Sequence, residues 1–144
     1  MELKIEDIRV GNYFKHNDLI SGSEYEGIFK WDVAHFSDID RCKLSIANLE
    51  PIPLTAELLE KCGFKKLPHF TVNNTRFIEL GRKRVLSVGC VGTPNEMVFI
   101  SEEEPPVVKD VVCIRNFDYD GYTYFHDIQN IYHAITGKEL TIAL

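Results

Sequence analysis

The segment TRFIELGRKRVLSV, residues 75–88, decides the fold, because it predicts two strands joined by a tight turn. Branched and aromatic side chains favour extended backbone on both sides of the turn, and a glycine punctuates the run. Similar strand-like runs at 70–72, 97–100 and 107–114 are separated by turn residues. The sequence therefore predicts an antiparallel meander of four or five strands within residues 70–117.

Two helices are predicted on either side of this meander. Thr55 is a favourable N-cap and Gly63 a favourable stop, so we expect a short helix over residues 56–62. A second, amphipathic helix ends at Gly137 and directs one apolar stripe toward the sheet. The stripe consists of Tyr124, Phe125, Ile128, Ile131, Tyr132 and Ile135.

The first fifty residues predict a smaller set of elements. Residues 2–10 are compatible with a short helix or a strand, and residues 13–16 predict a short strand. The aromatic and branched run at 25–36 predicts a longer strand. Residues 37–50 are expected to form an irregular connection.

The predicted fold class is α+β, an antiparallel sheet with a short middle helix and a C-terminal amphipathic helix packed on it. The length suits one core. We therefore expect a single domain over residues 1–144. Within it, residues 1–50 could form an N-terminal β sub-lobe and residues 51–144 an α+β body.

Charge disfavours general nucleic-acid binding. The chain carries 16 basic and 22 acidic side chains, a formal net charge of −6, and an acidic chain repels the phosphate backbone at long range. The charge is unevenly distributed, because residues 1–50 carry −4, residues 51–100 carry +3 and residues 101–144 carry −5. The middle block is the exception to the acidic character of the chain.

Several features point to the cytoplasm. No apolar run approaches the ~20 residues that span a bilayer, and the charged first seven residues do not resemble a secretory signal. Wide cysteine spacing disfavours a disulfide framework or a zinc knuckle. We therefore expect a cytoplasmic protein without membrane association, metal or cofactor. The cysteines are Cys42, Cys62, Cys90 and Cys113.

A basic window covers residues 61–84, which contain seven basic side chains and a single acidic one, Glu79. Phe64, Phe70 and Phe77 are interleaved, and phenylalanine is a residue type that stacks on single-stranded bases. One interpretation is a patch for an anionic partner. The other is that the phenylalanines face the core while the basic residues solvate turns or protect a sheet edge. The candidate patch residues are Lys65, Lys66, Arg76, Arg82, Lys83 and Arg84.

The predicted C-terminal helix also has a polar face, formed by His126, Gln129, Asn130 and His133. These residues either face solvent without a further role or form a recognition surface. The two histidines are separated by about 10.5 Å along the helix axis. They are therefore too far apart to bind one metal ion together.

The sequence contains no coherent catalytic set. It lacks a nucleophile elbow, a phosphate-binding loop and a calcium-binding loop. Asp32 and His35 are three residues apart on a predicted strand, so they would face opposite sides. An enzyme of unrecognised type would need a pocket that gathers His35, Asp32 or His126.

Three segments of the chain form a recognisable pattern by their order and spacing: IRVGNY at 8–13, PIPLTAELLEKCGF at 51–64 and HDIQNIYHAITGKEL at 126–140. They resemble a group of small uncharacterised bacterial and phage or prophage proteins with the pattern IRxGN … PIPLTxExLxKxGF … HxxQNxYxAxTGxEL. This chain has Leu58 or Leu59 where those proteins often carry tryptophan. The resemblance implies a small intracellular protein of a phage or mobile element, and it supplies no catalytic residues.

We therefore expect a non-enzymatic accessory protein that binds a protein partner or associates with itself. The first alternative is a nucleic-acid-associated protein that uses the basic window at 61–84 for weak, salt-sensitive binding. The second alternative is an enzyme of unrecognised type.

Overall fold

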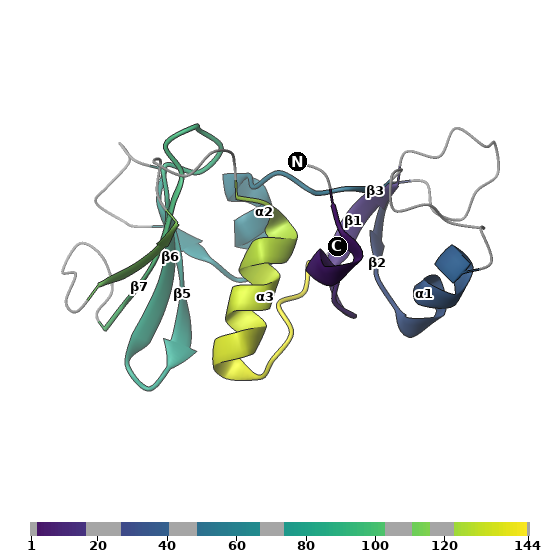
Figure 1. The fold of residues 1–144 in the computed structure, drawn as a ribbon. Coiled ribbons are helices and arrows are strands. Elements are labelled where there is room, and N and C mark those ends of the chain that lie inside the picture. The colour runs from purple at the N-terminus through teal and green to yellow at the C-terminus, as the bar shows by residue number, and fades with distance from the viewer. Residues whose placement is uncertain are drawn as a thin grey trace. The chain divides into compact units, whose positions relative to one another are not determined.

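The computed structural model describes residues 3–16, 27–40, 49–66, 74–102, 111–115 and 123–143. The chain forms two compact units, shown in Figure 1. Unit 1 comprises Met1–Ile52 and Tyr124–Asn130, and unit 2 comprises Pro53–Thr123 and Ile131–Leu144. Each unit contains an antiparallel sheet and helical residues, so the predicted α+β class is confirmed.

Unit 1 is built on a three-stranded antiparallel sheet with the order β2-β1-β3. The predicted strand over 13–16 is confirmed as β1. The opening residues form one turn of 3-10 helix. The elements are η1 (Ile5–Asp7), β1 (Tyr13–His16), β2 (Gly27–Lys30), α1 (Val33–Asp40) and β3 (Leu49–Glu50).

The long strand predicted over residues 25–36 is wrong in its second half. Strand β2 ends at Lys30, and α1 begins at Val33. Asp32 causes the change, because its Oδ1 accepts a hydrogen bond from the Val33 amide at 2.6 Å while His35 Nδ1 accepts from the Asp32 amide at 2.7 Å. These bonds satisfy amides at a helix start, which strand propensity does not detect. The irregular connection expected from residue 37 is likewise helical as far as Asp40, and residues 41–48 lie outside the described residues.

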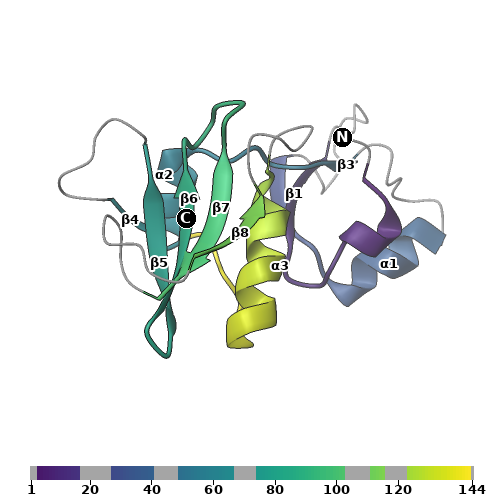
Figure 2. The same cartoon turned by 60° about the vertical axis from the view of Figure 1, so that its left-hand side comes forward.

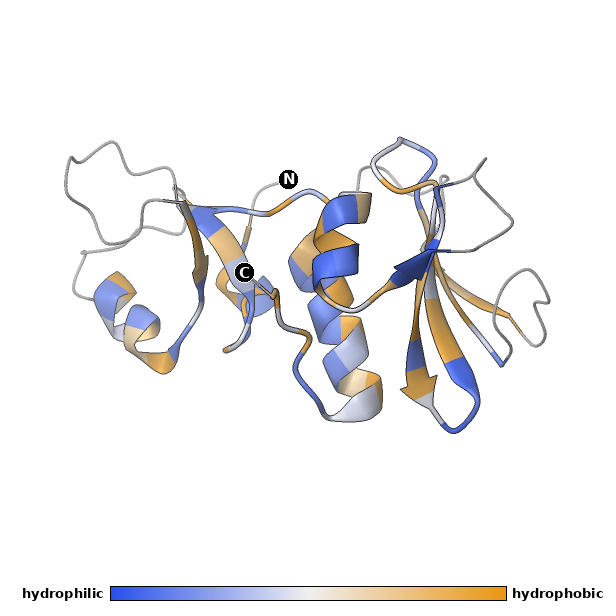
Figure 3. Cartoon of the chain, turned by 180° about the vertical axis from the view of Figure 1, so that it is seen from behind, coloured by the Kyte–Doolittle hydropathy of each residue, from blue (hydrophilic) through white to orange (hydrophobic). Residues whose placement is uncertain are grey.

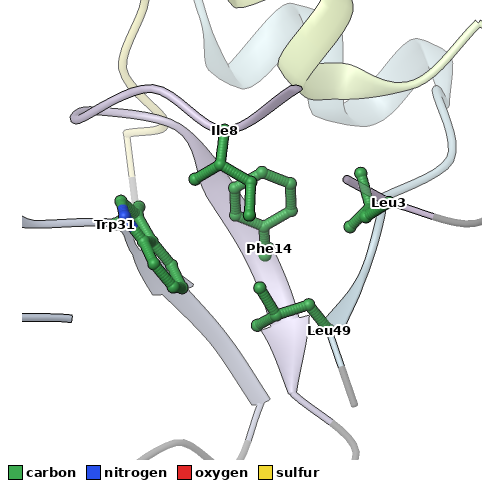
Figure 4. Packing of buried hydrophobic residues seen from close by; sticks show 5 residues of the cluster. All are labelled: Leu3, Ile8, Phe14, Trp31 and Leu49. Atoms are coloured by element: carbon green, nitrogen blue, oxygen red, sulfur yellow. The ribbon is translucent and has the colours of Figure 1, made fainter. Parts of the chain in front are cut away.

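Aromatic packing forms the core of unit 1 (Figure 4). Phe14 and Trp31 are fully buried, and their rings meet edge to face with centroids 6.2 Å apart. Leu3, Ile8 and Leu49 surround Phe14. Burying side chains of this size stabilises a fold by roughly 1.5–3 kcal/mol each. A small sheet thus obtains a core of its own.

Unit 2 is built on a five-stranded sheet in which neighbours in sequence are neighbours in space (Figure 2). All the pairings are antiparallel, so the predicted meander is confirmed in the described strands. The predicted strand at 70–72 lies outside the described residues, and the short β4 was not predicted. The strands are β4 (Lys65–Lys66), β5 (Arg76–Gly81), β6 (Arg84–Gly89), β7 (Met97–Ser101) and β8 (Val112–Arg115).

The short middle helix is confirmed as α2 (Ala56–Lys61). Thr55 caps it, because its Oγ1 accepts a hydrogen bond from the Leu58 amide at 3.1 Å. Gly63 ends it with a φ of +98°, and the amides of Gly63 and Phe64 donate to the last turn at 3.0 Å each. This is the Schellman termination, in which glycine adopts the left-handed conformation without a steric penalty.

The C-terminal helix is confirmed as α3 (Phe125–Thr136), and its residues divide between the units at Asn130. In unit 1, the Phe125 ring lies 6.1 Å from the Tyr13 ring, so this part of α3 packs on β1. Gly137 ends the helix with a φ of +69°. Leu140, beyond the helix, is buried in unit 2.

Candidate functional site

The main candidate site is a cleft of about 630 Å³ in unit 2, between the β5–β6 hairpin and the last turns of α3. Its volume falls in the range of roughly 300–1,000 Å³ that is usual for ligand pockets. Leu80, Tyr132 and Ile135 provide apolar surface. Five charged residues complete the wall: Glu79, Arg82, Arg84, Glu102 and Lys138.

An unusual turn supplies the cationic side of this cleft. Gly81 pairs with Arg84, which leaves Arg82 and Lys83 as a two-residue turn with φ of 52° and 60°. Two positive φ angles are typical of a type I′ turn, which favours Asn-Gly because the left-handed conformation crowds a Cβ. The chain therefore keeps two cationic side chains where they strain the backbone. Figure 3 shows this hairpin tip as a hydrophilic end of the sheet.

A smaller hollow of about 160 Å³ extends the site along the hairpin. It shares Glu79, Arg84 and Glu102 with the larger cleft and adds Lys83 and Val85. The hairpin thus contributes to the lining of both hollows.

The charges of the cleft are not neutralised by one another. In the ranges that the structure describes, Arg82, Arg84 and Lys138 form no ion pair, nor do Glu79 and Glu102. All five are solvent-exposed. With three positive and two negative side chains, the lining has a net charge of +1. The cleft is therefore a local positive site in an acidic chain.

The predicted basic patch is only partly brought together. Arg82 and Arg84 line the cleft, Lys83 lies in its extension, and Lys65 and Lys66 are exposed on β4 outside the lining.

Arg76 does not belong to an exposed basic patch, so this part of the prediction is wrong. Its side chain is 5% exposed, and its Nε donates to Glu60 Oε1 at 3.0 Å. Its Nη1 donates to the Thr75 carbonyl at 3.2 Å. Alternation along β5 turns Arg76 toward α2, where the carboxylate of Glu60 compensates its burial.

The expectation that the polar face of the C-terminal helix turns to solvent is also wrong for two residues. His126 is 1% exposed and Gln129 is 0% exposed. Asn130 is half-buried, and His133 is partly exposed with its Nε2 3.7 Å from Glu139 Oε1. A helical wheel separates polar from apolar residues, but it does not show which side of the helix is buried. Polar side chains can be buried where neighbouring groups form hydrogen bonds with them.

A hydrogen-bond network in unit 1 accounts for the buried amides. Gln129 Nε2 donates to the Gly11 carbonyl, and Gln129 Oε1 accepts from the Tyr13 amide, at 3.0 Å each. Asn130 Oδ1 accepts from Asn12 Nδ2 at 2.9 Å and from Arg9 Nε at 3.0 Å. The network joins residues 9–13 to α3, so these side chains hold the fold together.

The aromatic surroundings of His126 are equally structural. Its ring lies 5.3 Å from the Phe14 ring and 6.2 Å from the Tyr124 ring, and its Nε2 is 3.7 Å from Asp127 Oδ1. Asp32 and His35 instead contact each other at the start of α1. The described contacts place Asp32 and His35 at the start of α1 and surround His126 with aromatic rings.

Glu96 is a buried carboxylate in unit 2 that the sequence did not single out. Its side chain is 5% exposed, and its two oxygens accept from the Gly92 amide at 2.6 Å and the Thr123 amide at 3.1 Å. Burial raises the pKa of Glu96, and these two hydrogen bonds partly oppose the rise. The carboxylate thus links the turn after β6 to Thr123 by hydrogen bonds.

In the described residues, neither metal binding nor thiolate chemistry at Cys62 has support. Among them, no group of three or more His, Cys, Asp or Glu side chains could hold a metal ion. Burial raises the pKa of the Cys62 thiol to about 12, which keeps it protonated at neutral pH. Within the same residues, none of the helices has the length and apolarity to cross a membrane.

The sequence analysis proposed only Arg82 and Arg84 among the residues that line the cleft. Glu102 and Lys138 were not candidates, and Tyr132 was assigned to the apolar stripe. The available signal was at the turn itself, where Arg82 and Lys83 replace the usual turn residues.

We compared the chain with protein-family models, with curated proteins and with solved structures, and none of them matches it.

Proposed function

We propose that this protein is a non-enzymatic interaction module that binds a protein partner through the cleft of unit 2. The observation that supports this proposal is an exposed, strained cationic turn that lines the same cleft as the aromatic side chain of Tyr132. Arginine and tyrosine, together with tryptophan, are enriched among the residues that dominate the binding energy of protein interfaces. Here Arg82, Arg84 and Tyr132 line one cleft.

The same proposal includes the biological context of the protein, an accessory role in the cytoplasm. The resemblance of residues 8–13, 51–64 and 126–140 to small phage and prophage proteins supports an accessory role in a phage or mobile element. The described cysteines form no disulfide, which agrees with a reducing cytoplasm.

A capture experiment with charge-reversed variants tests this function. The wild-type chain, Arg82→Glu/Arg84→Glu and a matched control, Lys65→Glu/Lys66→Glu, are immobilised and exposed to lysate of the cells that encode the chain. We expect a protein that the wild type and the control retain and the cleft variant loses. Equal retention by all three, or no retained protein together with a monomer in light scattering, would contradict the proposal.

Nucleic-acid binding is less well supported than protein binding. Arg76 is paired with Glu60, and Glu79 and Glu102 stand beside the cationic residues, where they would repel phosphates. Tight, strongly salt-dependent binding of single-stranded oligonucleotides that the cleft variant abolishes would replace the protein partner by nucleic acid.

A further inference from the structure

We infer that the cleft of unit 2 binds an acidic peptide segment, with its carboxylates on Arg82 and Arg84 and its apolar side chains against Tyr132. This inference rests on the proposed function and adds the chemistry of the partner. The residues that make these two kinds of contact come from the β5–β6 turn, β6 and α3.

The available cations call for an anionic ligand. Within the described part of the chain, Arg82, Arg84 and Lys138 have no carboxylate partner. A guanidinium presents parallel N–H donors that match both oxygens of a carboxylate, so it selects geometry as well as charge. Two arginines two residues apart can therefore hold two acidic side chains of one extended segment.

The turn conformation supports a binding role for the cations. Positive φ at Arg82 and Lys83 is a local cost that Asn-Gly at the same turn would remove. Residues that break a local rule tend to gather at functional sites, where the strain persists because the side chains are needed. The turn thus keeps its charged side chains in spite of an unfavourable backbone conformation.

The two acids of the lining favour a peptide over nucleic acid. Glu79 and Glu102 share the cleft with the arginines, and they would repel a polynucleotide backbone, which carries a phosphate at every nucleotide. A peptide can place an amide, a hydroxyl or a basic side chain beside them. Leu80, Tyr132 and Ile135 offer apolar contact that the phosphodiester backbone cannot use.

A degenerate decapeptide library provides the direct test. The library is passed over the immobilised wild-type chain, and the retained peptides are sequenced by mass spectrometry. We expect enrichment of Asp and Glu together with apolar residues. For a synthetic peptide of the enriched sequence, we expect affinity to fall at least about tenfold in Arg82→Gln/Arg84→Gln.

Two controls keep the test decisive. Lys65→Gln/Lys66→Gln removes the same charge outside the cleft and should bind like the wild type. Arg82→Asn/Lys83→Gly should bind more weakly while melting at a higher temperature, so a loss of binding cannot be ascribed to unfolding. Retained peptides without acidic enrichment, or equal binding by the cleft variants, would overturn the inference.

The outcome is distinguishable from failure of the proposed function. If Arg82→Glu/Arg84→Glu loses a captured protein while the library shows no acidic enrichment, the partner uses the cleft and the acidic-peptide inference is wrong. If capture does not depend on the cleft and acidic peptides still bind there, the inferred chemistry holds and the proposed function fails.

Discussion

The side-chain amide of Asn12 donates a hydrogen bond to Oδ1 of Asn130, with 2.9 Å between nitrogen and oxygen and 118 positions between the two residues. The bond joins the segment before β1 to α3 inside unit 1. Two segments that are far apart in the sequence are thus bonded to each other.

The Asn12–Asn130 bond predicts energetic coupling between the two positions. In a double-mutant cycle with Asn12→Ala and Asn130→Ala, we expect a coupling energy of about 0.5–3 kcal/mol, measured by urea denaturation. Asn12→Ala combined with Ala134→Gln, at an exposed position of α3, should be additive within about 0.5 kcal/mol. Additivity for both pairs would show that the bond contributes nothing.

Gln129 is predicted to be the most costly polar residue of α3 to remove. Gln129→Ala leaves the Gly11 carbonyl and the Tyr13 amide buried without their present partner. Since each unsatisfied group costs about 1–3 kcal/mol, we expect the free energy of unfolding to fall by about 2–6 kcal/mol. The exposed control Ala134→Gln should stay within about 0.5 kcal/mol of the wild type. A similar small effect for both variants would exclude a structural role for Gln129.

The β5–β6 turn is predicted to become more stable when its charges are lost. Arg82→Asn/Lys83→Gly places the preferred residues at positive φ, so we expect unfolding to require about 1–2 kcal/mol more. Thermal denaturation measures the change as a higher Tm. Arg84→Gln, which removes charge without relieving the turn, is the control and should leave Tm nearly unchanged. A lower Tm for the double variant would mean that the turn is not strained.

Glu96 predicts a specific dependence of stability on pH. Burial raises its pKa above the ordinary value of 4.5, so the folded chain binds this proton more tightly than the unfolded chain. Its contribution to stability is therefore full below about pH 4.5 and is lost as the pH rises through the raised pKa.

Comparison with Glu96→Gln isolates this titration, because the other groups are common to both proteins. Urea denaturation from about pH 4 to about pH 8 should show the wild type losing stability relative to the variant as the pH rises. A difference that is constant, or that moves in the opposite direction, would show that burial of Glu96 does not favour its protonated form.

Local signals predicted much of the fold. Thr55 and Gly63 marked the limits of α2 because capping and left-handed glycine act within one turn. The strand prediction failed at residues 33–36, where aromatic and branched side chains favour β-structure. There Asp32 and His35 satisfy amides of a helix start, and a few hydrogen bonds outweigh a weak propensity.

The candidate site was less predictable than the fold. Arg82 and Arg84 were recognised as cationic, but whether they line one cleft together with Lys138 depends on how α3 ends beside the hairpin. Arg76 looked equivalent to them in sequence and proved to be buried against Glu60. Charge is visible in a sequence, whereas pairing and burial require the neighbours that only folding supplies.

The sequence alone determined the limits of α2, the end of α3, the meander and the uneven charge, because these depend on residues within a few positions of one another. The tertiary structure alone decided which polar residues lie inside and which cations share a cleft. Gln129 is buried because the Gly11 carbonyl and the Tyr13 amide offer it hydrogen-bond partners, and Arg82 is exposed because a two-residue turn carries it outward. Solvation and ion pairing depend on neighbours in three dimensions. The arginines of the β5–β6 hairpin therefore differ, since Arg76 is buried against Glu60 and Arg82 is exposed in the cleft.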